Sequence, residues 1–129
     1  MNNDVIIYLP WPPSVNNYYK TGRHGQRYLH HSVRDFRAAV AECLSEQCPG
    51  LTLDDRLFVE VYLHPPTRRA CDIDNYMKGL LDALTEGGLW EDDKLIDQLH
   101  IYRGEIVKGG SVKIEVSEAG PLIPADTTC

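Results

Sequence analysis

The fold is decided by residues 57–88, LFVEVYLHPPTRRACDIDNYMKGLLDALTEGG. In Leu57–Leu63, apolar residues at every second position alternate with partly polar ones, which predicts a strand with one buried face. His64-Pro65-Pro66 ends that strand, because proline cannot continue it. From about Ile73 to Glu86 the apolar residues recur at helical spacing, and Gly87-Gly88 then closes the helix. The stretch therefore predicts a strand and a helix joined by a polar loop.

The same patterns place the other elements on either side. Further strands are expected at Val5–Leu9, Arg27–His30, Ile96–Arg103 and Ser111–Glu118, the last two joined by a turn at Gly109-Gly110. A helix is expected to begin at Ser32 as N-cap, with Asp35 completing a capping box, and to end at Cys48-Pro49-Gly50. The order strand, strand, helix, strand, helix, strand, strand predicts a single-domain α+β fold with a mixed or mostly antiparallel sheet.

Three prolines in Pro10–Tyr19 exclude a helix or a central strand there. Lys20–Arg27 holds Gly22 and Gly25 and is expected to be a mobile basic loop. The domain is expected to span residues 1–120, and residues 121–129 to form a disordered tail.

A length of 129 residues suits one core. No apolar run reaches the roughly 18 residues of a membrane span, and Met1–Asp4 lacks the features of a secretory signal, so we expect a cytoplasmic protein. Four cysteines, Cys43, Cys48, Cys71 and Cys129, form no Cys-x-x-Cys pair, and we expect them to be reduced thiols rather than zinc ligands or disulfides.

The charge is unevenly distributed along the chain. The net charge of −6 by itself argues against non-specific binding to nucleic acid. However, residues 1–37 hold five basic and two acidic side chains, whereas the remainder is strongly acidic. This division suits a protein that grips an anion with one part and a cation with another, although scatter over a solvated surface would produce it too.

Asp72 and Asp74 stand at the start of the second helix, and Lys78 follows one turn later. Closely spaced carboxylates are the ligands that Mg²⁺ prefers, so this stretch is a candidate metal site. An ordinary structural role is also open at this point, and the spacing alone favours it. Asp72 suits an N-cap, Asp74 favours the helix dipole, and Asp74 and Lys78 have the spacing of a surface ion pair.

A second acidic group follows the helix, at Glu91, Asp92 and Asp93. Three adjacent like charges repel one another, which invites a cation, although such a run is also typical of a solvated turn. Trp90 is expected to be a core anchor. His30, His31, Tyr18 and Tyr19 are weaker candidates for contacts with phosphate or bases. No phosphate-binding Walker A loop, EF-hand loop or nucleophile elbow is present in the sequence.

Three segments in this order resemble the RusA-type Holliday junction resolvases, a family of small phage and bacterial endodeoxyribonucleases. They are LPWPPSVNNYY at Leu9–Tyr19, DIDNYMKGLLDAL at Asp72–Leu84 and GLWEDDKLID at Gly88–Asp97, within a resemblance that runs from about Ile6 to Val116. The resemblance implies a homodimeric α+β enzyme that cuts four-way DNA junctions with Mg²⁺ or Mn²⁺. It also implies a cytoplasmic role in DNA recombination and repair, for a host or a prophage.

The family's site residues carry over position by position. The resemblance implies that Asp72, Asp74 and Asp93 bind metal, with Asp92 as a further candidate ligand, and that Lys78 supports catalysis. The family often has a basic residue immediately before the first aspartate, where this chain has Cys71. Arg68 and Arg69 lie slightly further back.

DNA would be held by basic residues, which we expect to contact the phosphate backbone. They are Lys20, Arg23, Arg27, Arg34, Arg37, Arg68 and Arg69. Two other classes of function stay open at this point: a non-catalytic DNA-binding protein on the same fold, and a small metal-dependent nucleotide phosphohydrolase.

Overall fold

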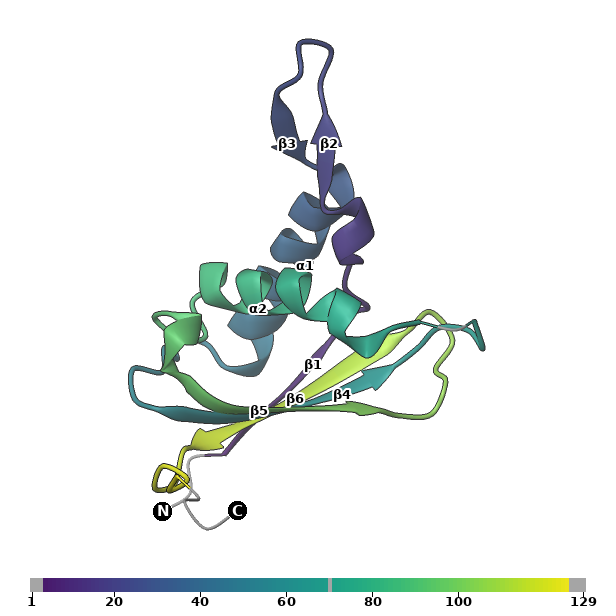
Figure 1. Ribbon diagram of the computed structural model, residues 1–129. Coiled ribbons are helices and arrows are strands. Elements are labelled where there is room, and N and C mark those ends of the chain that lie inside the picture. Colours follow the sequence, from purple (N-terminus) through teal and green to yellow (C-terminus); the bar gives the residue numbers. More distant parts are fainter. Residues whose placement is uncertain (1–3, 70, 126–129) are drawn as a thin grey trace.

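A computed structural model describes residues 4–69 and 71–125, which form a four-stranded sheet covered on one face by two helices (Figure 1). The sheet has the order β1-β6-β4-β5, with β1 at Val5–Leu9, β6 at Ser111–Glu118, β4 at Leu57–His64 and β5 at Ile96–Arg103. Strands β1 and β4 pair antiparallel with β6, whereas β4 and β5 pair parallel. The predicted α+β class and mixed sheet are confirmed.

The parallel pair requires a crossover, because parallel neighbours cannot be joined by a tight hairpin. That crossover carries a 3-10 turn, η2 at Ile73–Tyr76, and then helix α2 at Met77–Glu86. A second short turn, η3 at Asp93–Leu95, leads into β5. Both acidic groups singled out in the sequence therefore belong to one crossover, the first before α2 and the second after it.

The core lies between the sheet and the two helices, α1 at His31–Gln47 and α2. Alternation in the strands supplies one side of it: every second residue of β4 from Leu57 to Leu63 is buried, as are Val112, Ile114 and Val116 of β6. Trp90 is also buried and donates a hydrogen bond from Nε1 to Thr85 Oγ1 at 2.6 Å. The prediction that Trp90 is a core anchor is confirmed.

A two-stranded hairpin projects from the helical layer, away from the sheet (Figure 1). It consists of β2 at Tyr19–Thr21 and β3 at Arg27–Leu29, paired antiparallel. The second strand was predicted, but β2 was not, and the basic segment from Lys20 is partly a strand rather than wholly a loop. The reason is that all three residues of β2 are exposed, so no alternation of apolar and polar residues marks it.

The helix starts also differ in detail from the predictions. The N-cap of α1 is His30 rather than Ser32: His30 Nδ1 accepts a hydrogen bond from the backbone N–H of Ser32 at 3.1 Å. The histidine nitrogen thus takes the place of the serine oxygen as acceptor for an unpaired helix N–H. The second helix begins as predicted near Ile73, but its first turn is the 3-10 turn η2.

Three of the cysteines, Cys43, Cys48 and Cys71, are free thiols, as predicted, while Cys129 lies outside the described residues. In the expected tail, residues 121–125 are exposed and belong to no helix or strand, and residues 126–129 lie outside the described part of the chain. No helix in the described residues is both long enough and apolar enough to cross a membrane.

The proline-rich segment packs closely on α2 through Gly79. A Cβ atom on Gly79 would lie 3.2 Å from Pro13 Cγ and 3.3 Å from the Pro13 carbonyl oxygen. Pro13 lies just before the 3-10 turn η1 at Val15–Asn17, whose N-cap Ser14 accepts a hydrogen bond from the N–H of Asn16. The absence of a side chain at residue 79 therefore sets how closely this segment approaches the helix.

We predict that Gly79→Leu lowers the free energy of unfolding by about 2 kcal/mol, because overpacking this contact forces the Pro13 backbone away. Urea unfolding measures the loss. Gly120→Leu is the matched control, since nothing lies within 4 Å of a Cβ at residue 120. Equal urea midpoints for the two variants would show that the contact between the proline-rich segment and α2 is not tight.

Candidate active site

Asp72 is the N-cap residue of η2, but its side chain makes no capping hydrogen bond. Asp72 and Asp74 are both exposed. A hydrogen bond joins the residue before Asp72 to the sheet: Arg103 Nη2, at the end of β5, donates to the Cys71 carbonyl oxygen at 2.5 Å. The capping role considered for Asp72 is therefore not what its carboxylate does, and that carboxylate is available to a ligand.

Lys78 lies one turn into the helical segment and pairs with Asp82 rather than with Asp74. Its Nζ is 3.5 Å from Asp82 Oδ2 and 5.0 Å from the centre of the Tyr18 ring. The surface pair between Asp74 and Lys78, open on the sequence alone, is not among the ion pairs of the described residues. Because Lys78 and Asp82 are four residues apart on α2, they lie on one side of this helix.

Asp92 and Asp93 interact with each other beyond the C-terminal end of α2. The backbone N–H of Lys94 donates to Asp92 Oδ1 at 3.0 Å, and this bond, followed by the hydrogen bond with Asp93, lowers the pKa of Asp92. Burial raises the pKa of Asp93, helped by the hydrogen bond to Asp92 and by the negative charges of Asp92 and Asp82. The site thus carries like-charge repulsion that a cation would relieve.

We call the side chains of Asp72, Asp74, Lys78, Asp82, Asp92 and Asp93 the acidic strip. It starts before α2, follows this helix and ends in η3 (Figure 1). Within residues 4–69 and 71–125, no three carboxylate, histidine or cysteine side chains lie close enough together to hold a metal ion. The predicted ligands thus lie on one crossover, but in the described residues Asp72, Asp74 and Asp93 are not close enough together to bind one metal ion.

The predicted DNA contacts lie in three places. Lys20, Arg23 and Arg27 are exposed on the β2–β3 hairpin, where the Arg27 guanidinium lies 4.4 Å from the centre of the Tyr19 ring. Arg34 is exposed on the first turns of α1. Arg68 and Arg69 are exposed in the loop between β4 and η2, so they precede the acidic strip directly.

Arg37 differs from the other predicted contacts, because it is paired within the protein. Its Nη1 is 2.7 Å from Glu86 Oε2, its Nη2 donates to the Tyr18 hydroxyl at 2.6 Å, and only 22% of its side chain is exposed. Arg37 therefore belongs to the packing of α1 against α2.

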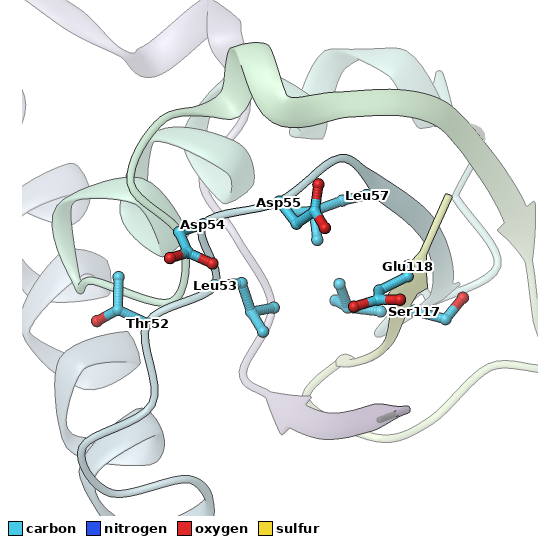
Figure 2. A pocket seen from close by; sticks show the side chains of 8 residues that line it. Thr52, Leu53, Asp54, Asp55, Leu57, Ser117 and Glu118 are labelled. Carbon is cyan, nitrogen blue, oxygen red and sulfur yellow. The ribbon is translucent and has the colours of Figure 1, made fainter. Parts of the chain in front are cut away.

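Two hollows of the surface are relevant to the choice of site. One, of about 310 Å³, is lined by Trp11, Pro65, Pro66, Thr67, Arg69, Cys71 and Tyr76, and so adjoins Asp72. The other contains the carboxylates of Asp54, Asp55 and Glu118, which do not meet at one point (Figure 2). Asp55 also accepts a hydrogen bond from the N–H of Arg56. Of these two hollows, the first is lined by an arginine, Arg69, and by Cys71, the neighbour of Asp72 in the chain.

The sequence of this chain matches a known protein family. The family model for the endodeoxyribonuclease RusA matches residues 10–117. This chain belongs to the RusA family. It is 32% identical over 118 residues to the crossover junction endodeoxyribonuclease RusA of Escherichia coli strain K12, and the alignment covers 92% of this chain and 98% of that protein. The corresponding proteins of Enterobacteria phage 82 and Shigella sonnei strain Ss046 are 32% and 31% identical, with the same coverage.

Three polar contacts at the crossover are absent from the sequence predictions: Asp82, the hydroxyl of Tyr18, and Arg103. Asp82 has a signal in the sequence, because it follows Lys78 by four residues on a helix. Tyr18 and Arg103 have none, because each reaches the crossover from a distant part of the chain.

The raised pKa of Asp93 predicts an unusual effect on stability. The folded chain disfavours the charged form of Asp93, so above its folded pKa this charge costs stability. The cost declines as the pH falls through the folded pKa and is gone below the lower pKa of the unfolded chain. In EDTA at pH 7, Asp93→Asn should therefore raise the thermal midpoint, and its advantage over the wild type should shrink in acid. Circular dichroism melts measure both.

Asp97 is the matched control with the opposite sign. The ion pair with Arg56 lowers the pKa of Asp97, so its charge contributes stability at neutral pH that is lost as the pH falls through the folded pKa. Asp97→Asn should lower the midpoint at pH 7. If both variants shift the midpoint in the same direction, the repulsion at Asp93 is absent.

Proposed function

We propose that this chain is a structure-selective endodeoxyribonuclease that resolves four-way DNA junctions in the cytoplasm by paired nicks, with Mg²⁺ or Mn²⁺. The observation that carries the proposal is the near full-length relation to proteins named crossover junction endodeoxyribonucleases. The range matched by the family model, residues 10–117, spans the acidic strip. The availability of the Asp72 carboxylate supports it, because a capping role alone would have used that side chain.

The donor set fits a hard divalent cation, which prefers carboxylate oxygens. Asp72, Asp74 and Asp93 would hold the ion, with Asp92 as a further ligand. Repulsion between Asp92 and Asp93 supports this fit, since a cation would stabilise the charged form of both. When bound, such an ion polarises the phosphate and lowers the pKa of a water molecule.

The remaining work falls to side chains of the chain itself. Lys78 is exposed and its ammonium group would lie against the negative charge that develops on the scissile phosphate. The exposed basic residues of the hairpin, together with Arg34, Arg68 and Arg69, would bind the DNA backbone on either side of the strip.

We further propose that the chain acts as a homodimer. A two-fold dimer would present two acidic strips related by the symmetry of a four-way junction. Paired nicks on opposed strands would then follow from one binding event, whereas a monomer would nick one strand per encounter.

The metal mechanism is tested with Asp74→Asn. This change removes a charged ligand at an exposed position, so it should abolish cleavage of a labelled four-way junction while the thermal midpoint stays close to that of the wild type. Asp54→Asn, in the acidic hollow of Figure 2, is the control and should cut normally. Cleavage by Asp74→Asn at the wild-type rate, or by the wild type in excess EDTA, would exclude the mechanism.

Binding is predicted to depend on the hairpin rather than on the carboxylates. In EDTA, Arg23→Ala should bind the junction more weakly and with a shallower salt dependence, because it loses a phosphate contact and the counterions released there. Asp72→Asn should bind at least as tightly as the wild type, since it removes repulsion from phosphate. Gel-shift titrations at two salt concentrations measure both.

Arg56→Ala controls for the loss of positive charge, because Arg56 is already paired with Asp97. It should bind like the wild type. If Asp72→Asn loses binding in step with cleavage, the carboxylate has a structural role. Hydrolysis of free nucleotides with no cutting of junction or duplex would favour the phosphohydrolase alternative.

A further inference from the structure

Tyr18 is a buried residue whose hydroxyl group joins two helices. Only 1% of its surface is exposed, and its hydroxyl donates to Asp82 Oδ2 of α2 at 2.6 Å. The same oxygen accepts a hydrogen bond from Arg37 Nη2 of α1, also at 2.6 Å. Packing of an aromatic ring does not require this arrangement, because a phenylalanine would fill the same space.

The acceptor of the tyrosine hydrogen bond is also the partner of Lys78. Asp82 Oδ2 lies 3.5 Å from Lys78 Nζ, which itself lies over the Tyr18 ring, 5.0 Å from the ring centre. One carboxylate oxygen and one ring face therefore restrain the ammonium group from two directions. A lysine with four rotatable bonds would otherwise spread over many conformers.

Arg37 supplies a positive charge next to the carboxylate of Asp82. Arg37 lies 3.9 Å from Asp82 and 2.7 Å from Glu86, so one guanidinium faces two carboxylates. Burial, helped by the hydrogen bond to Asp82, raises the pKa of Tyr18 to about 12. The hydroxyl thus stays a donor throughout the pH range in which a nuclease would be assayed.

We propose that Tyr18 and Asp82 are positioning residues for Lys78: Asp82 holds the lysine ammonium beside the acidic strip, and the Tyr18 hydroxyl holds Asp82. This inference rests on the proposed function, because it assigns a purpose to the restraint only if Lys78 acts in cleavage. Neither residue contacts DNA or metal in this role.

The same tyrosine also fixes the base of the hairpin. Its carbonyl oxygen accepts a hydrogen bond from the N–H of His30 at 3.0 Å, directly before β2 begins at Tyr19. Tyr18 therefore restrains the start of the basic hairpin through its backbone and the lysine of the strip through its side chain. Tyr18 would therefore help to set both the position of the DNA backbone on the hairpin and the position of Lys78.

The test is a double-mutant cycle on junction cleavage. Tyr18→Phe keeps the ring and removes the hydroxyl, so the single-turnover rate of the saturated complex should fall by about tenfold while the Kd for the junction in EDTA stays unchanged. In the Lys78→Ala background, Tyr18→Phe should cause no further loss. Asp82→Asn, which keeps an acceptor for Tyr18 but loses the charge, should show the same pattern.

Glu86→Gln is the matched control, because it removes the negative charge that faces Arg37 from Glu86 and leaves Tyr18, Asp82 and Lys78 in place. It should cleave at the wild-type rate. If Tyr18→Phe fails to fold, Asp82→Asn alone completes the cycle.

The outcomes separate this inference from the proposed function. If Lys78→Ala itself cuts like the wild type, the role proposed for Lys78 fails. If Lys78→Ala is impaired but Tyr18→Phe and Asp82→Asn cut normally, or if their losses persist in full without Lys78, the positioning role is wrong. A loss of binding equal to the loss of rate would also overturn it.

Discussion

The hydrogen bond from Tyr18 to Asp82 joins residues 64 positions apart, and it ties the segment before the hairpin to the acidic strip. The hairpin follows Tyr18 immediately, and the strip includes Asp82. Close packing of Pro13 on Gly79 brings the two segments together, and the buried Tyr18 hydroxyl adds a specific polar contact between them. A polar bond of this kind adds specificity because a misplaced partner would leave a buried donor or acceptor unpaired.

Electrostatics explain how an acidic chain can belong to a family of DNA-cutting enzymes. The net charge of −6 is concentrated outside the first 37 residues, while the hairpin and the start of α1 expose Lys20, Arg23, Arg27 and Arg34. DNA phosphates would bind to these cations first. They would approach the acidic strip only when a cation neutralises the negative charge of its carboxylates. Burial, together with the hydrogen bond to Asp92 and the charges of Asp92 and Asp82, raises the pKa of Asp93, so repulsion acts at this position of the strip.

Much of the fold could be predicted from the sequence, because buried strands and helices carry periodic patterns. β1, β5 and β6 have the predicted bounds, and β4 extends one residue further. β2 could not be found, because an exposed three-residue strand has no apolar alternation. The helix start at His30 was missed because a ring nitrogen acts there as the cap. In the site, residue types indicated Asp72, Asp74, Lys78 and Asp93, but the link from Lys78 through Asp82 to Tyr18 is set by tertiary packing alone.

The central claim is that the acidic strip holds a divalent cation that Asp72 and Asp74 share. Anomalous diffraction from crystals of the full chain soaked in Mn²⁺ tests it most directly. The account predicts a peak bonded to carboxylate oxygens of both Asp72 and Asp74, with Asp93 drawn toward it, and loss of that peak in Asp74→Asn. A peak confined to Asp54, Asp55 and Glu118, or no peak on the strip at millimolar Mn²⁺, would contradict it.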